Sequence, residues 1–193
     1  MHAENYFMLK HLLSVNDFAI AARLLPRLDS DVTLTSWLHD WQLQHEPVTA
    51  TINNTNVSSV PDLWLDFTVR AGSQKKPFAM PIWVELDRGT EWGKRFQDKL
   101  TAIVLLVTEQ AHEKRFGVQN ITVAFATPGT IKRRDLMRQH IKTVLTALGK
   151  LRYADLFLFA SLPQELDPRE IFLSPMWYTP TSDTPLSLLD LSD

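Results

Sequence analysis

Two strand-like segments joined by a short polar turn constrain the fold of this chain most. In LWLDFTVR (63–70), apolar and polar residues alternate with the period of a β-strand. AGSQKK (71–76) has the composition of a turn, and PFAMPIWVELD (77–87) is a second strand-like segment. The sequence therefore predicts an antiparallel hairpin, in which Pro81 weakens the second strand or marks a β-bulge.

Helices and strands are predicted to alternate after this hairpin. A long helix is expected from Glu91 to about Phe116, with Gly117 ending it. The next expected elements are a mostly apolar strand, an amphipathic basic helix and another strand, at 120–128, 131–148 and 154–162. This alternation predicts an α/β fold with a mixed central β-sheet flanked by helices.

Two helices are predicted before the hairpin. LLSVNDFAIAARLLPRL (12–28) has apolar residues at helical spacing, and Pro26 is expected to end or kink it. TLTSWLHDWQLQHE (33–46) is predicted as the second helix, with its apolar residues on one face. VTATI (48–52) can form a short strand, and 53–61 has the composition of a turn.

Length and composition fit an ordinary globular protein with one sizeable core. The chain has 193 residues, 45% of them hydrophobic and 22% charged, and no cysteine, which excludes disulfides and thiolate zinc sites. We expect a cytoplasmic protein that avoids the membrane, because no signal-peptide pattern is present and the longest apolar run, 102–107, is short. The expected division is an N-terminal helical segment, an α/β core and a C-terminal tail that wraps the surface or is loose, at 1–32, 33–162 and 163–193.

Charge is distributed unevenly along the chain. Residues 70–152 carry 16 Lys or Arg against 7 Asp or Glu, although the net charge of the whole chain is only −2. A basic central region suits a polyanionic partner such as DNA. The alternative is that basic helices simply have solvated faces.

Carboxylates gather at the end of the second predicted strand, in VELDRGTE (84–91). Because side chains alternate along a strand, Glu85 and Asp87 share one face. The hairpin can bring Asp62, at the start of the first strand, beside Glu85, and such a pair suits a hard divalent cation or shares a proton. Alternatively, Glu85 and Asp87 are solvated, with Arg88 and Glu91 in a surface ion pair.

Several short motifs together resemble a known family. VNDFAIA, PDLWLDF, VELDRGTE and KLTAIV, within roughly residues 11–162, resemble the replication-relaxation family of bacterial and plasmid proteins, in the PD-(D/E)XK nuclease superfamily. The resemblance implies an αβββαβ restriction-endonuclease-like core and a metal-dependent DNA nuclease-like protein of a plasmid or mobile-element replication system. It also implies an upstream winged-helix region for DNA binding, whereas this sequence begins at the VND helix. A protein partner is therefore a candidate to supply DNA targeting.

The resemblance also assigns roles to residues. Asp62 and Glu85 match the two acids of the superfamily, and Asp87 stands where a lysine is usual. Lys99, on the following helix, is then the candidate to replace that lysine. The predicted catalytic residues are Asp62, Glu85, Asp87 and Lys99; Mg²⁺ or Mn²⁺ is expected on Asp62, Glu85 and Asp87, with Asp40 from helix 33–46. Predicted DNA contacts are Arg88, Lys94, Arg95, Lys132, Arg133, Arg134 and Arg138.

Two other functions compete with nuclease activity. A nuclease fold without catalysis would serve as a DNA-binding or replication-accessory module, which the absent strand lysine favours. A protein–protein module would use the acidic tail as its contact. Zinc hydrolysis and serine hydrolysis lack support, because the six histidines show no H-x-x-x-H spacing and no G-x-S-x-G motif is present.

Overall fold

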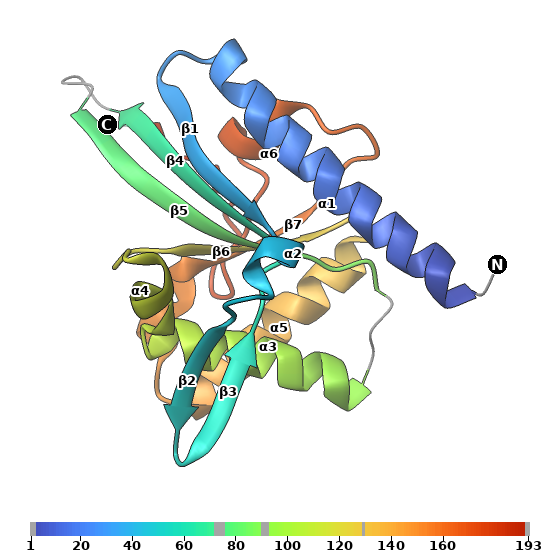
Figure 1. The fold of residues 1–193 in the computed structure, drawn as a ribbon, viewed down its shortest axis with the longest axis vertical. Helices are drawn as coiled ribbons and strands as arrows, with labels where there is room; N and C mark the ends of the chain where they lie inside the picture. The colour runs from blue at the N-terminus through green and yellow to red at the C-terminus, as the bar shows by residue number, and fades with distance from the viewer. Residues whose placement is uncertain (1–2, 72–75, 90–92, 129, 192–193) are drawn as a thin grey trace.

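A five-stranded sheet lies between two layers of helices in the computed structural model, which describes residues 3–71, 76–89, 93–128 and 130–191 (Figure 1). The sheet order is β1-β4-β5-β6-β7. These strands are β1 (Val32–His39), β4 (Leu63–Ala71), β5 (Lys76–Leu86), β6 (Thr122–Thr127) and β7 (Phe157–Ser161). The pairs β1–β4 and β4–β5 are antiparallel, and β5–β6 and β6–β7 are parallel, so the predicted α/β fold with a mixed sheet is confirmed.

Each face of the sheet has its own helical layer (Figure 1). One face is covered by α1 (Ala3–Leu28), α6 (Pro168–Leu173) and the chain after α6. The other is covered by α3 (Gly93–Thr108), α4 (Ala111–Phe116), α5 (Ile131–Ala147) and the hairpin of β2 (Val48–Ile52) and β3 (Thr55–Ser59). The short helix α2 (Asp40–Leu43) and the 3₁₀ turn η1 (Leu151–Leu156) connect these elements.

Alternating side chains of the central hairpin fill two separate cores. Leu65 and Val84 pack in the core beneath α1, whereas Trp64 and Trp83 pack in the core beneath α3. Every residue of β5 from Ile82 to Leu86 is buried, as expected of a central strand. Glu85 therefore lies inside the protein, on the face of the sheet that α3 covers.

The predicted hairpin forms, and Pro81 does not interrupt it. β4 and β5 pair without a register shift, with Asp66 opposite Pro81. Pairing of β5 with β6 begins only at Ile82, so the N-terminal part of β5 has a free edge on that side. A proline without an N–H is tolerated at such an edge, which is why the expected bulge is absent. Part of the predicted turn, residues 72–75, lies outside the described residues.

The prediction of a helix at 33–46 is wrong. This segment instead forms β1 and the single turn of α2. Leu34, Ser36 and Leu38 are half-buried while the residues between them are exposed, so the segment has the period of a strand. Pairing with β4 outweighs the helical spacing of Leu34, Trp37, Leu38 and Trp41, and Trp41 is 62% exposed.

Several other boundaries differ from the prediction. The first helix begins at Ala3 rather than at residue 12, and the predicted turn at 53–61 contains β3 after Asn53 and Asn54, which both have positive φ. The long helix is interrupted between α3 and α4, where Gln110 adopts a left-handed conformation. Gly117 ends α4 in the same conformation, as predicted, and Glu91 lies outside the described residues.

The C-terminal segment is part of the core rather than a loose tail. Tyr178 pairs with Phe159 of β7, and Trp177 pairs with Leu186. Its buried side chains include Ile171, Phe172, Trp177, Leu188 and Leu189. Of the two expected arrangements, the loose tail is therefore wrong, because a few well-spaced apolar residues suffice to fix the segment. Among the helices of the described chain, none has the length and apolarity required to cross a membrane.

Candidate active site

Asp62 lies where the start of β4 meets the end of β5. Its backbone N–H donates to Val84 O at 3.1 Å. One carboxylate oxygen, Oδ2, accepts a hydrogen bond from the backbone N–H of Leu86 at 2.7 Å, and Oδ1 accepts one from His11 Nε2 of α1 at 3.2 Å. The Asp62 side chain is therefore fixed between the end of β5 and the first helix.

Glu85 is the buried acid of the central strand, with only 2% of its surface exposed. Its Oε1 accepts a hydrogen bond from Trp83 Nε1 at 2.7 Å. Its Oε2 forms an ion pair with Lys99 Nζ of α3 at 2.7 Å. The Lys99 side chain is 40% exposed, so its ammonium group reaches the buried carboxylate from the solvent side.

The two carboxyl groups have pKa values shifted in opposite directions. Burial raises the pKa of Glu85 to about 7, with the Asp62 charge adding to the rise and Lys99 opposing it. Burial also acts to raise the pKa of Asp62, but the hydrogen bond from His11 and the charge of Lys99 outweigh it and lower that pKa. The bond to Asp62 raises the pKa of His11. Two neighbouring acids with divergent pKa values are typical of catalytic sites.

Asp87 is held by an arginine. Its Oδ1 accepts hydrogen bonds from Arg133 Nη2 at 3.0 Å and from the Gly89 backbone N–H at 3.1 Å, while Oδ2 pairs with Arg133 Nε. Arg133 is 6% exposed and its guanidinium lies 4.0 Å from the centre of the Phe96 ring. The Asp87 charge is therefore neutralised within the protein.

A small cavity brings three of the four predicted catalytic residues together. It measures about 20 Å³, which is room for about one water molecule. Its lining residues are Glu85, Asp87, Phe96, Lys99, Leu100, Phe125 and Met137. Asp62 is not among the lining residues, but it precedes Leu63, which pairs with Val84, so it lies at the level of Glu85 in the hairpin. The predicted proximity of Asp62, Glu85 and Lys99 is thus present in the fold.

Asp40 does not occupy the predicted position in a helix that precedes the strands. It is the first residue of α2, directly after β1. Its backbone N–H donates to Asp62 O at 3.2 Å, but its carboxylate accepts from Gln44 Nε2 of the same segment at 3.4 Å. Within the described ranges, no group of three or more His, Cys, Asp or Glu side chains is arranged to hold a metal ion.

Several arginines predicted to contact DNA fasten parts of the fold together. Arg88 Nη1 donates to the backbone oxygen of Lys10 in α1 at 2.9 Å. Arg138 donates to Thr179 O at 3.0 Å and to Asp183 at 2.9 Å, which attaches the C-terminal segment to α5. Arg134 stacks on Tyr178 of the same segment. Of the remaining predicted contacts, the exposed residues are Lys94, Arg95 and Lys132.

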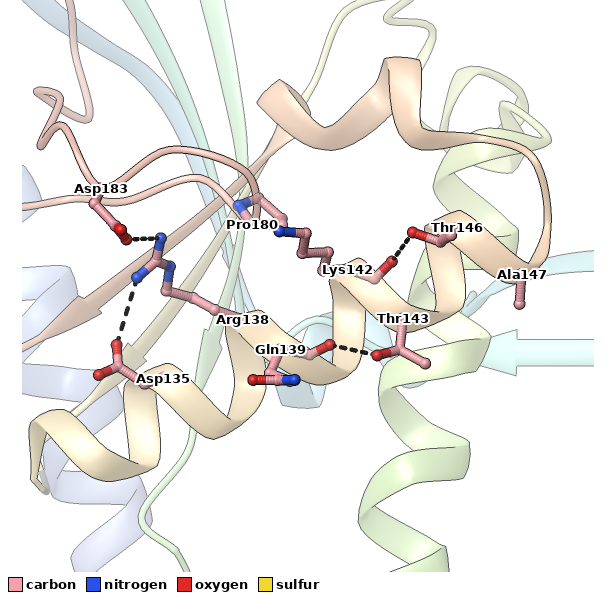
Figure 2. A pocket seen from close by; sticks show the side chains of 9 residues that line it. All are labelled: Asp135, Arg138, Gln139, Lys142, Thr143, Thr146, Ala147, Pro180 and Asp183. Carbon is pink, nitrogen blue, oxygen red and sulfur yellow. Dashed lines mark hydrogen bonds and ion pairs between the residues drawn. The ribbon is translucent and has the colours of Figure 1, made fainter.

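A larger pocket of about 630 Å³ runs along the outer side of α5 (Figure 2). Arg138 lies between Asp135 and Asp183, and Lys142 extends towards Pro180 (Figure 2). Two acids thus offset two bases among its lining residues. This balance of charge does not favour an anionic ligand such as phosphate over a neutral one.

His11 was not predicted as a member of the site. It lies 51 residues from Asp62 in the sequence, and no local motif links the two. Trp83 was likewise missed, although its spacing of two residues from Glu85 on a strand places both side chains on one face.

Comparison with protein-family models, curated proteins and solved structures found no match.

The raised pKa of Glu85 predicts a pH-dependent stability. Between about pH 4.5 and pH 6.5 the folded protein keeps a proton on Glu85 that the unfolded chain has released, so stability should fall as pH rises. Glu85→Gln should flatten this slope, measured by urea denaturation across that range. His11, whose pKa is also raised, contributes in the same direction but from about pH 6.5 upward. An unchanged slope in the variant would show that Glu85 does not titrate in this range.

Proposed function

We propose that this protein is a nuclease-like enzyme of the PD-(D/E)XK type, related to the replication-relaxation family, that hydrolyses DNA phosphodiester bonds with a divalent cation. The observation that carries the proposal is the convergence of Asp62, Glu85 and Lys99 at the end of the β4–β5 hairpin. If α2, the β2–β3 hairpin and α4 are treated as insertions, the remaining order α1, β1, β4, β5, α3, β6 supports the αβββαβ order that the resemblance implies.

The site chemistry fits Mg²⁺ or Mn²⁺ on two carboxylates. Mg²⁺ is commonly bound by one or two carboxylates together with water and substrate phosphates, so a third acid is not required. Glu85 is buried and pairs with the Lys99 ammonium, so a bound cation would take the place of that ammonium at this carboxylate. Asp62 and Glu85 would hold the ion, which activates water and offsets phosphate charge when bound. Asp87 is not included, because Arg133 neutralises it.

The remaining residues have separable roles in this proposal. Lys99 reaches the site from a half-exposed position, so its ammonium can leave Glu85 and bind an oxygen of the attacked phosphate. His11 orients Asp62, and Trp83 orients Glu85, each through one hydrogen bond. These two are positioning residues, comparable to the outer-shell partners that fix metal ligands in other sites.

A second candidate is a nuclease fold that binds DNA without cleaving it. It is favoured by one observation: each acid of the site already has a basic partner from the protein itself. The pairs are Glu85 with Lys99, Asp62 with His11, and Asp87 with Arg133. Such a protein would act as a replication-accessory module, with the exposed basic side chains binding the DNA backbone.

Nicking of supercoiled plasmid DNA separates these candidates. We expect cleavage in Mg²⁺ and none in EDTA. If the protein binds DNA in a salt-sensitive way but does not cleave it in Mg²⁺ or Mn²⁺, the second candidate, the accessory module, is favoured over the enzyme. Absence of both cleavage and DNA binding at low salt would refute both and favour a protein–protein module.

A further inference from the structure

The face of α1 that points away from the sheet is apolar. On the inner face, Phe18, Ala22 and Leu25 are fully buried in the core beneath this helix. A turn of 100° per residue places a second set of apolar residues on the opposite face. This outer stripe consists of Tyr6, Leu9, Leu13, Ile20 and Leu24, which are between 39% and 51% exposed.

A helix with two opposite apolar faces is normally buried on both. Monomeric proteins also rarely expose a large apolar surface. The outer stripe spans 18 residue steps from Tyr6 to Leu24, or about 27 Å at 1.5 Å per residue. Figure 1 shows α1 on the outside of its layer, with the sheet and α6 on its other side. The stripe is therefore open to a partner along its whole length.

We propose that a second copy of this chain packs its own α1 antiparallel against the outer stripe. Most homodimers are two-fold symmetric, so the same patch of each copy must be complementary to itself. A two-fold axis between Leu13 and Ser14 places Leu13 of the two copies together. The same axis brings Tyr6 and Leu9 of each copy alongside Ile20 of the other.

Charge supports the antiparallel direction. Lys10 and Asp17 lie within about 40° of Tyr6 around the helix and are equally distant from this axis. Each Lys10 then meets Asp17 of the other copy, whereas a parallel pair would bring like charges together. Asp17 also argues against a lipid surface as the partner, because an acid inside the stripe is repelled by anionic headgroups.

The proposed interface does not depend on nuclease activity. His11 is on the inner side of α1, where it contacts Asp62, so the outer stripe and the candidate site use different faces of one helix. Dimerisation therefore leaves each site open.

Sedimentation equilibrium of the full chain tests the proposal. We expect wild-type protein to approach twice the 22.1 kDa mass of the chain with increasing concentration. Leu9→Gln combined with Leu13→Gln should weaken the dimer at least about 100-fold, because it removes central apolar contacts in both copies. Met8→Gln is the matched control: Met8 is 73% exposed but lies 140° round the helix from Leu13, so the dimer should persist.

A charge exchange tests the direction of packing. Lys10→Glu and Asp17→Lys should each weaken the dimer, and combining them in one chain should restore it. A monomer at about 100 µM, well above the dissociation constants typical of specific interfaces, would overturn the proposal, whether or not that monomer binds vesicles or another protein. A dimer that survives the double leucine variant, or that the charge exchange fails to restore, would also overturn it. Circular dichroism melting confirms that each variant is folded.

Discussion

Replacement of Glu85 by glutamine is expected to lower Mg²⁺-dependent DNA cleavage at least about 100-fold, because loss of outer-shell partners alone costs 10–100-fold at metal sites. Glutamine keeps the size of the side chain and an oxygen that can accept the hydrogen bond from Trp83. It removes the negative charge that pairs with Lys99 and that a cation would bind. The folded structure should therefore persist while cleavage is lost.

Glu109→Gln provides the matched control for this experiment. Glu109 is also paired with a lysine, Lys150, but it lies at the end of α3 and is 46% exposed. Its replacement should leave cleavage unchanged. Equal cleavage by wild type and Glu85→Gln would show that Glu85 takes no part in the reaction, and it would refute the proposed nuclease mechanism. Initial rates of plasmid nicking at fixed Mg²⁺ concentration give the comparison.

The part of the site that the sequence predicted depends on local geometry. Alternation along the hairpin predicted that Asp62 and Glu85 would meet, since paired strands bring opposite residues together. Lys99 came from the family resemblance, as the replacement for the strand lysine, and the helix that carries it begins soon after β5. The geometric inference about Asp62 and Glu85 needed only the hairpin itself.

The rest of the site depends on contacts between distant segments. His11 reaches Asp62 across 51 residues, and Arg133 reaches Asp87 across 46. Neither spacing has a periodic signal, because loops between the segments can have any length. Strand β1 was not predicted for the same reason, because its hydrogen bonds to the distant strand β4 determine its conformation. The tryptophans that resembled a helical stripe are Trp37, on the exposed side of β1, and Trp41, in the turn that follows it.

Replacement of Asp87 by alanine is expected to destabilise the protein by about 3–5 kcal/mol, the usual result of removing one partner of a buried ion pair. The variant removes the carboxylate that accepts two hydrogen bonds from the buried Arg133 guanidinium. It also removes the acceptor of the Gly89 backbone N–H, which helps to hold the turn after β5. Urea denaturation of wild type and variant at one pH measures the difference in free energy of unfolding.

A double variant distinguishes the contribution of the Asp87–Arg133 ion pair to stability from the contribution of side-chain packing. Asp87→Ala with Arg133→Met should regain most of the lost stability, since methionine fills the space beside Phe96 without a charge to compensate. A loss below about 1 kcal/mol in Asp87→Ala alone would be typical of a solvated surface pair instead. In that case Arg133 would not neutralise Asp87 in solution, and Asp87 would be available as the third cation ligand that the sequence predicted.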